Sequence, residues 1–146
     1  MHQLALVHEF MSTMGQATPD KPTMLNKRER RFRWSLTREE NKELRDAEDL
    51  VEYLDAVTDK LYVTLGDAVA AGFDVGTLSQ AFHEVHRSNM SKLWSDGEIE
   101  GGLPEDCTAK PSNVAGLHIV TRKDGKVIKS PSYSPANLAQ YIEKQP

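Results

Sequence analysis

The chain has 146 residues, a formal net charge of −4 and one cysteine, Cys107. This length is typical of a single domain with a moderate core, and one cysteine excludes an internal disulfide framework and suits a reducing compartment. The negative charge disfavours binding to DNA or an anionic membrane through the field of the whole protein. No segment resembles a signal peptide or a membrane span, so we expect a cytoplasmic protein without membrane partners.

Apolar residues recur at three- and four-residue steps along four segments, which is the pattern of amphipathic helices. The first helix is expected to end near Gly15, the second begins at Lys27, the third covers about residues 50–71, and the fourth follows Asp74 as a suitable N-cap. Because four helices with short connections pack well against one another, the sequence predicts an antiparallel four-helix bundle.

The composition changes after Gly97, where glycine and proline become frequent. Asp124-Gly125 is flanked by β-branched residues, which is typical of a two-residue hairpin turn, and a short helix is expected near residues 136–142. We therefore predict an all-α fold, a four-helix antiparallel bundle over residues 1–96. A small C-terminal β-hairpin extension, residues 97–146, belongs to the same domain.

Acidic side chains are concentrated on the second and third helices, where residues three, four or seven apart share a face. If these helices are antiparallel neighbours, the carboxylates meet in a partly enclosed space where repulsion and desolvation disfavour ionisation. Bound cations would relieve this conflict, and oxygen ligands match Mg²⁺ or Mn²⁺. The ordinary alternative is a solvated acidic face. The acids are Glu39, Glu40, Glu43, Glu52, Asp55 and Asp59.

The pattern Glu39-Glu40-x-x-Glu43, followed on the next helix by an acidic pair before Leu61-Tyr62-Val63, resembles the motif of the MazG-like superfamily. This superfamily includes dimeric dUTPases and phosphoribosyl-ATP pyrophosphohydrolases. Its second helix carries Glu-x-x-Asp, of which the aspartate falls on Asp59 and the glutamate on Ala56. We assign the missing ligand role to Asp55, with Glu52 as the alternative.

The resemblance implies hydrolysis of a nucleoside triphosphate to the monophosphate and pyrophosphate, by attack of a metal-activated water on the α-phosphorus. It implies Mg²⁺ held by Glu40, Glu43, Asp55 and Asp59. Glu39 and Glu40 are the expected catalytic residues, with Glu39 either a further ligand or the general base. The resemblance also points to dUTP or dCTP as substrate, and to a homodimer or dimer of dimers.

Further matches suggest the substrate contacts. Arg33-x-x-Leu36-x-x-Glu39 and the segment 84–92 resemble the same subgroup, in which an asparagine and a lysine three residues later face the substrate. The resemblance thus assigns substrate contacts to Arg33, Asn89 and Lys92, with the two cations on phosphate oxygens. The tail 124–135 resembles an extension that closes over the nucleotide, which assigns similar roles to Lys129 and Tyr133.

Two other functions stay open. A bundle that keeps the fold without activity, as a nucleotide-binding or regulatory protein, would account for Ala56. A nucleic-acid-binding module could use the basic run of residues 27–38, with Trp34 as a stacking side chain. We do not expect nucleic acid as a partner, because the neighbouring acids repel a phosphate backbone.

Overall fold

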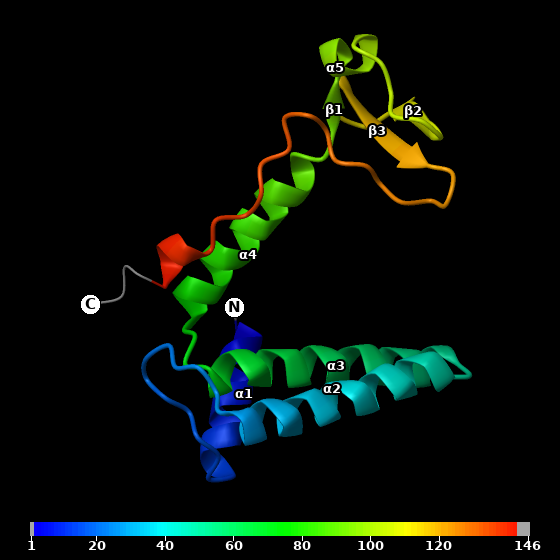
Figure 1. Cartoon of the computed structure of the whole chain (residues 1–146). Coiled ribbons are helices and arrows are strands. Elements are labelled where there is room, and N and C mark those ends of the chain that lie inside the picture. The colour runs from blue at the N-terminus through cyan, green and yellow to red at the C-terminus, as the bar shows by residue number, and fades with distance from the viewer. Residues whose placement is uncertain (1, 143–146) are drawn as a thin grey trace. The chain divides into compact units, whose positions relative to one another are not determined.

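The computed structural model describes residues 2–142, which form four long helices and a small antiparallel sheet of three strands (Figure 1). The predicted helical fold class with a small C-terminal β extension is confirmed. The chain divides into two compact units, one up to Ser79 and one from Gln80, and this division lies inside α4 (Val75–Met90). The expected boundary after residue 96 marks the change from helix to strand, and the assignment of both parts to one domain stays a prediction.

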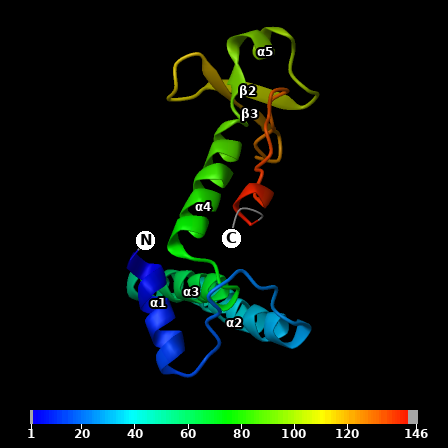
Figure 2. The ribbon, with the colours of Figure 1, turned by 90° about the vertical axis from the view of Figure 1, so that its left-hand side faces the viewer.

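The first unit contains α1 (His2–Thr13), α2 (Lys27–Asp46), α3 (Leu50–Ala70) and the start of α4. Figures 1 and 2 show α2 and α3 side by side and antiparallel. The core joins α1 to the second half of α3, because both helices bury residues spaced three or four apart. Its buried members are Leu4, Val7, Met11, Leu65, Ala68 and Val69.

Side-chain caps fix where α2 and α3 begin. Asn26 accepts hydrogen bonds from two backbone N–H groups in the first turn of α2, and the Glu29 carboxylate accepts one from the Asn26 N–H, which completes a capping box. The Asp49 carboxylate accepts hydrogen bonds from the Val51 and Glu52 N–H groups at the start of α3, without a capping box. Because only residues 47–49 separate the two helices, these caps also fix which faces of α2 and α3 meet.

The end of α3 requires a glycine. Gly72 has φ of 73°, and a Cβ at this position would collide with the backbone carbonyl of Lys21 and lie 2.9 Å from the carbonyl oxygen of Pro19. The Thr23 N–H donates to the Ala71 carbonyl oxygen over 2.9 Å. The loop between α1 and α2 therefore passes directly over the end of α3, where only a residue without a side chain fits.

The second unit contains the rest of α4, β1 (Trp94–Ser95), α5 (Asp96–Glu100), β2 (Cys107–Pro111), β3 (Leu117–Arg122) and the 3₁₀ helix η1 (Ala139–Tyr141). β3 is the central strand and pairs antiparallel with β1 and β2. Val120 and Trp94 are buried, and the Trp94 indole N–H donates to the Ile128 carbonyl oxygen over 3.1 Å.

The predicted turn at Asp124-Gly125 forms, with Gly125 at φ of 85°. However, the main antiparallel partner of β3 is β2 rather than the segment after this turn, where a single bridge joins Thr121 to Val127. The expected hairpin is present but short, since the Arg122 N–H donates to the Lys126 carbonyl oxygen and the Ile128 N–H donates to the Val120 carbonyl oxygen, after which the chain leaves the sheet. The short helix expected near residues 136–142 is the single turn of η1.

The segment of residues 128–137, here called the C-terminal strap, runs back along α4 (Figures 1 and 2). The Ser130 hydroxyl donates to the Ser91 carbonyl oxygen over 2.9 Å, and Arg87 donates to the Pro135 carbonyl oxygen over 3.1 Å. The Asn137 N–H donates to the Glu84 carboxylate over 2.9 Å. These bonds fix the strap on α4 with little apolar burial. Within residues 2–142, no helix is long and apolar enough to cross a bilayer.

Candidate metal centre

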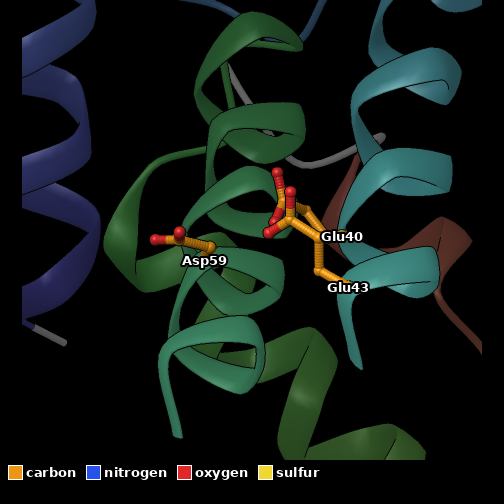
Figure 3. A group of neighbouring side chains, drawn as sticks. All are labelled: Glu40, Glu43 and Asp59. Carbon is orange, nitrogen blue, oxygen red and sulfur yellow. The ribbon is translucent and has the colours of Figure 1, made fainter. Parts of the chain in front are cut away.

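Three carboxylates lie close together on α2 and α3. Glu40 and Glu43 from α2 and Asp59 from α3 each offer one oxygen, and these three oxygens lie within 4.8 Å of one another (Figure 3). The ligands of an octahedral Mg²⁺ at about 2.1 Å are about 3–4 Å apart, so the three oxygens would have to move closer together to bind one ion.

Of the three carboxylates, Glu40 has the least favourable electrostatic surroundings. Its Oε2 atom is buried and has no hydrogen-bond partner among the described residues. Burial, followed by repulsion from Glu43, Asp59, Glu39 and Asp55, raises the pKa of Glu40 above its ordinary value of 4.5. A buried carboxylate oxygen without a donor is costly unless a cation binds it. The orphaned oxygen and the all-oxygen donor set therefore fit a hard divalent cation.

This repulsion predicts a pH-dependent effect of Glu40→Gln in metal-free protein. The folded state holds the Glu40 proton more tightly than the unfolded chain does. Protonated Glu40 therefore stabilises the fold at low pH, and this stabilisation is lost as pH rises through the raised pKa of Glu40. In EDTA at pH 7, the variant should melt about 3 °C higher than the unaltered chain, and this difference should disappear near pH 4. The matched control is Glu105→Gln, which should leave the melting temperature unchanged. Equal melting curves for Glu40→Gln and the unaltered chain at pH 7 would contradict the proposed repulsion.

The remaining acids of the predicted ligand set lie beside the cluster. An open pocket of about 260 Å³ is lined by Glu43, Glu52, Asp55 and Ala56, among others. Ala56 is buried, so the position of the missing glutamate faces this pocket with only a methyl group. The Glu52 carboxylate accepts a bond from the Glu48 N–H over 2.9 Å. Asp55 is outside the group of three close oxygens, and its ligand role stays a prediction, as does the catalytic role of the exposed Glu39.

Arg33 connects α2 to α3. Its Nε donates to the Asp67 carboxylate over 2.6 Å and its Nη2 donates to the Val63 carbonyl oxygen over 2.7 Å, while the side chain is only 12% exposed. Gly66 makes room for it, because a Cβ there would collide with the guanidinium. This contact was not expected from the sequence, since Asp67 is distant along the chain. The substrate contact assigned to Arg33 stays a prediction, and the structure gives the side chain a role in helix packing.

A double-mutant cycle tests this packing role. Alanine in place of a helical glycine normally stabilises a helix by about 1 kcal/mol. In the unaltered chain, Gly66→Ala should give no such gain, because the new methyl group displaces the Arg33 guanidinium from Asp67 and Val63. In an Arg33→Ala background, the same change should stabilise by about 1 kcal/mol. Urea unfolding measures both effects, and equal values in the two backgrounds would refute the contact.

The other predicted substrate contacts lie in the second unit, where they gather around Tyr133. The Lys129 ammonium is 4.1 Å from the centre of the Tyr133 ring, and Lys92 donates to the Asn89 side-chain oxygen over 2.7 Å. The Ser88 hydroxyl donates to the Tyr133 oxygen over 3.2 Å. This bond, followed by the charges of Lys129 and Lys92, lowers the pKa of Tyr133. No sequence pattern predicts a role for Ser88, which is buried and bonded to Tyr133 of the strap.

A helix carrying Glu-Glu-x-x-Glu against an aspartate on the next helix is the arrangement of the MazG-like all-α pyrophosphohydrolases. The family model of phosphoribosyl-ATP pyrophosphohydrolase matches residues 7–89, which is more than half of the chain. The chain therefore belongs to the phosphoribosyl-ATP pyrophosphohydrolase family, and family membership implies a pyrophosphohydrolase. The match contains the three converging carboxylates but ends before Lys92, Lys129 and Tyr133. No curated protein matches the chain.

Proposed function

We propose that this protein is a Mg²⁺-dependent pyrophosphohydrolase that converts a nucleoside triphosphate to its monophosphate and pyrophosphate. The observation that supports this proposal is the approach of Glu40, Glu43 and Asp59 within 4.8 Å, with one oxygen of Glu40 buried and unpartnered. An acidic pocket of this kind does not bind a polyphosphate by itself, so a cation between the two is required by charge.

Each residue has a distinct role in the proposed reaction. Glu40, Glu43 and Asp59, assisted by Asp55, would hold Mg²⁺ or Mn²⁺. When bound, the ion supplies a water of lowered pKa and neutralises charge on the phosphates. Glu39 is exposed at the edge of the cluster, where its carboxylate can accept the proton of the water that attacks the α-phosphorus.

The second unit supplies groups suited to a nucleotide. Lys92 and Lys129 are cations that can donate to phosphate oxygens. The Asn89 amide can both donate and accept, as recognition of a sugar hydroxyl or a base edge requires. The choice of dUTP or dCTP as the proposed substrate rests on the family resemblance alone, because these groups do not distinguish one base from another.

Two copies of the chain are proposed to pair through α3. Leu50, Leu54, Val57 and Leu61 follow one another at steps of three and four residues, yet they are 84%, 66%, 41% and 51% exposed. A continuous apolar stripe on a long helix is expected to be covered in solution. A homodimer or a dimer of dimers would cover it, and sedimentation velocity of the unaltered chain and of Leu54→Glu tests this.

A nucleotide panel tests the proposed reaction. Pyrophosphate release is measured with dUTP, dCTP, the other deoxynucleoside and nucleoside triphosphates, and phosphoribosyl-ATP, in Mg²⁺, in Mn²⁺ and in EDTA. We expect release with at least one substrate in Mg²⁺ and none in EDTA. If no substrate is hydrolysed while calorimetry shows nucleotide binding, the protein is the inactive nucleotide-binding member that Ala56 allows. Hydrolysis that persists in EDTA would disprove the metal-dependent reaction.

A further inference from the structure

The charges of α2 are separated onto different faces of the helix. The residues at positions 27, 31, 34, 38 and 42 follow steps of three and four, so they lie along one face, and all five are exposed. Arg33, Leu36 and Glu40 are half-buried, and Arg33 bonds to α3. We call the exposed face the basic stripe. Its members are Lys27, Arg31, Trp34, Arg38 and Lys42.

The basic stripe does not serve the stability of α2. Lys27 and Arg31, and again Arg38 and Lys42, are like charges four residues apart, and each such pair disfavours the helix. Cations in the first turn also oppose the helix dipole. Among the described residues, no ion pair involves Lys27, Arg31 or Lys42, although Lys42 is attracted to Asp46 four residues later. No residue of α2 is fully buried, so little burial offsets the repulsion at Lys27 and Arg31. A ligand of negative charge would relieve this repulsion.

Trp34 points to the nature of that ligand. Its side chain lies in the middle of the stripe and is 62% exposed, and the Arg38 guanidinium is 5.4 Å from the centre of its ring. An exposed indole between cations offers a flat surface for stacking and positive charges on both sides of it. Proteins bind single-stranded nucleic acid with this combination, because the aromatic ring stacks on a base and the cations contact the flanking phosphates.

The acids of α2 do not prevent this contact. Glu40 is half-buried and its carboxylate belongs, with Glu43, to the candidate metal centre between α2 and α3. Glu29 is bound to the Asn26 N–H in the capping box. On the sequence alone, nucleic acid is not expected as a partner, because acids near the basic run would repel its phosphates. In the folded helix Glu29, Glu40 and Glu43 lie on other faces than the stripe. Asp46 is paired with Arg45, which leaves the exposed Glu39, about 100° around the helix axis from Arg38, as the nearest unpaired acid of α2 among the described residues.

We propose that the basic stripe of α2 binds single-stranded nucleic acid, independently of the proposed hydrolysis. The stripe is about 22 Å long at 1.5 Å per residue, and Trp34 divides it, with Lys27 and Arg31 on one side and Arg38 and Lys42 on the other. One base would stack on Trp34 while the phosphates before and after it contact these pairs. Duplex DNA offers no unstacked base to Trp34, and it should therefore bind more weakly.

Fluorescence anisotropy with labelled oligo(dT), oligo(U) and a duplex of the same length tests the proposal in EDTA, where metal-dependent binding is absent. With three to four phosphate contacts, raising NaCl from 50 to 200 mM should weaken single-strand binding about 20- to 50-fold. Arg31→Gln/Arg38→Gln should weaken it at least about tenfold and reduce the salt dependence. Trp34→Ala should weaken it about tenfold with the salt dependence retained. Single strands should quench the fluorescence of exposed Trp34, while Trp94 is buried.

Lys110→Gln/Lys126→Gln is the matched control, because it removes the same charge from exposed positions of the second unit. Binding that is undetectable, or that falls equally in this control, overturns the proposal. Equal binding of duplex and single strand overturns it as well. The proposal is also overturned if the unaltered chain binds no oligonucleotide and Arg31→Gln/Arg38→Gln dissociates an oligomer. That result would make the stripe a contact between copies of the chain. Nucleotide turnover should be unchanged in all these variants, so this test is separate from that of the hydrolysis.

Discussion

An Asp59→Asn chain is expected to release pyrophosphate about a thousandfold more slowly than the unaltered chain in Mg²⁺. Asp59 is the member of the cluster that α3 contributes, and its oxygen completes the group that Glu40 and Glu43 begin from α2. An amide keeps the shape but donates hydrogen where a cation requires a negative oxygen. The loss of several kcal/mol of charge stabilisation at the metal corresponds to a rate effect of this size.

The same variant should retain its helicity, since Asp59 is exposed and takes no part in the core. Initial rates with the preferred nucleotide, circular dichroism and calorimetric titration of Mn²⁺ measure activity, fold and metal affinity on one preparation. Asp20→Asn, the same change on an exposed loop residue, should behave like the unaltered chain. Near-normal turnover in Asp59→Asn, with Mn²⁺ affinity unchanged, would remove the candidate metal centre.

Replacement of Gly72 by alanine is expected to lower the free energy of unfolding by about 3 kcal/mol or more. The methyl group would meet the Lys21 and Pro19 carbonyls, which are backbone atoms and cannot swing away. Gly15→Ala is the matched control, because Gly15 has a similar φ of 69° but nothing within 4 Å of a Cβ. Gly15→Ala should lower the free energy of unfolding by only about 1–2 kcal/mol, the penalty of placing alanine in the left-handed conformation. Urea denaturation compares the two variants, and equal losses would show that the loop yields to the methyl group.

Periodicity and caps were sufficient to predict the helices. The spacing of Leu4, Val7 and Met11 and the acid patterns of α2 and α3 are local properties. The structure buries the first three together and brings Glu40, Glu43 and Asp59 close to one another. The match of the family model confirms the resemblance carried by Glu39-Glu40-x-x-Glu43. The metal, the substrate and the roles of the site residues stay predictions.

Some contacts that the sequence did not reveal join distant segments, and others involve short segments without a clear pattern. Arg33 and Asp67 form an ion pair across two helices, and neither residue alone signals the other. β2 pairs with β3 although its sequence is short and contains proline and lysine, which are unusual in strands. The strap is held by serine hydroxyls and backbone groups, which have no periodic pattern.

The charge pattern of α2 shows another feature that is difficult to predict from the sequence. Along the sequence, the basic run of residues 27–38 is followed directly by Glu39, Glu40 and Glu43, and the net charge of the chain hides both groups. Winding the segment into a helix places Arg31 and Arg38 on one face and Glu40 and Glu43 on others. A prediction that counts charges by position along the chain therefore misses a separation that depends on angle around the helix axis.

The ligands of the candidate metal centre all come from a single hairpin of two consecutive helices joined by residues 47–49. Gathering them closes only a short loop, which costs little chain entropy, and neighbouring helices are among the fastest elements to meet during folding. If the proposed divalent ion binds there, it could meet its ligands before α1 has docked. The site would then guide the assembly of the first unit rather than wait for it.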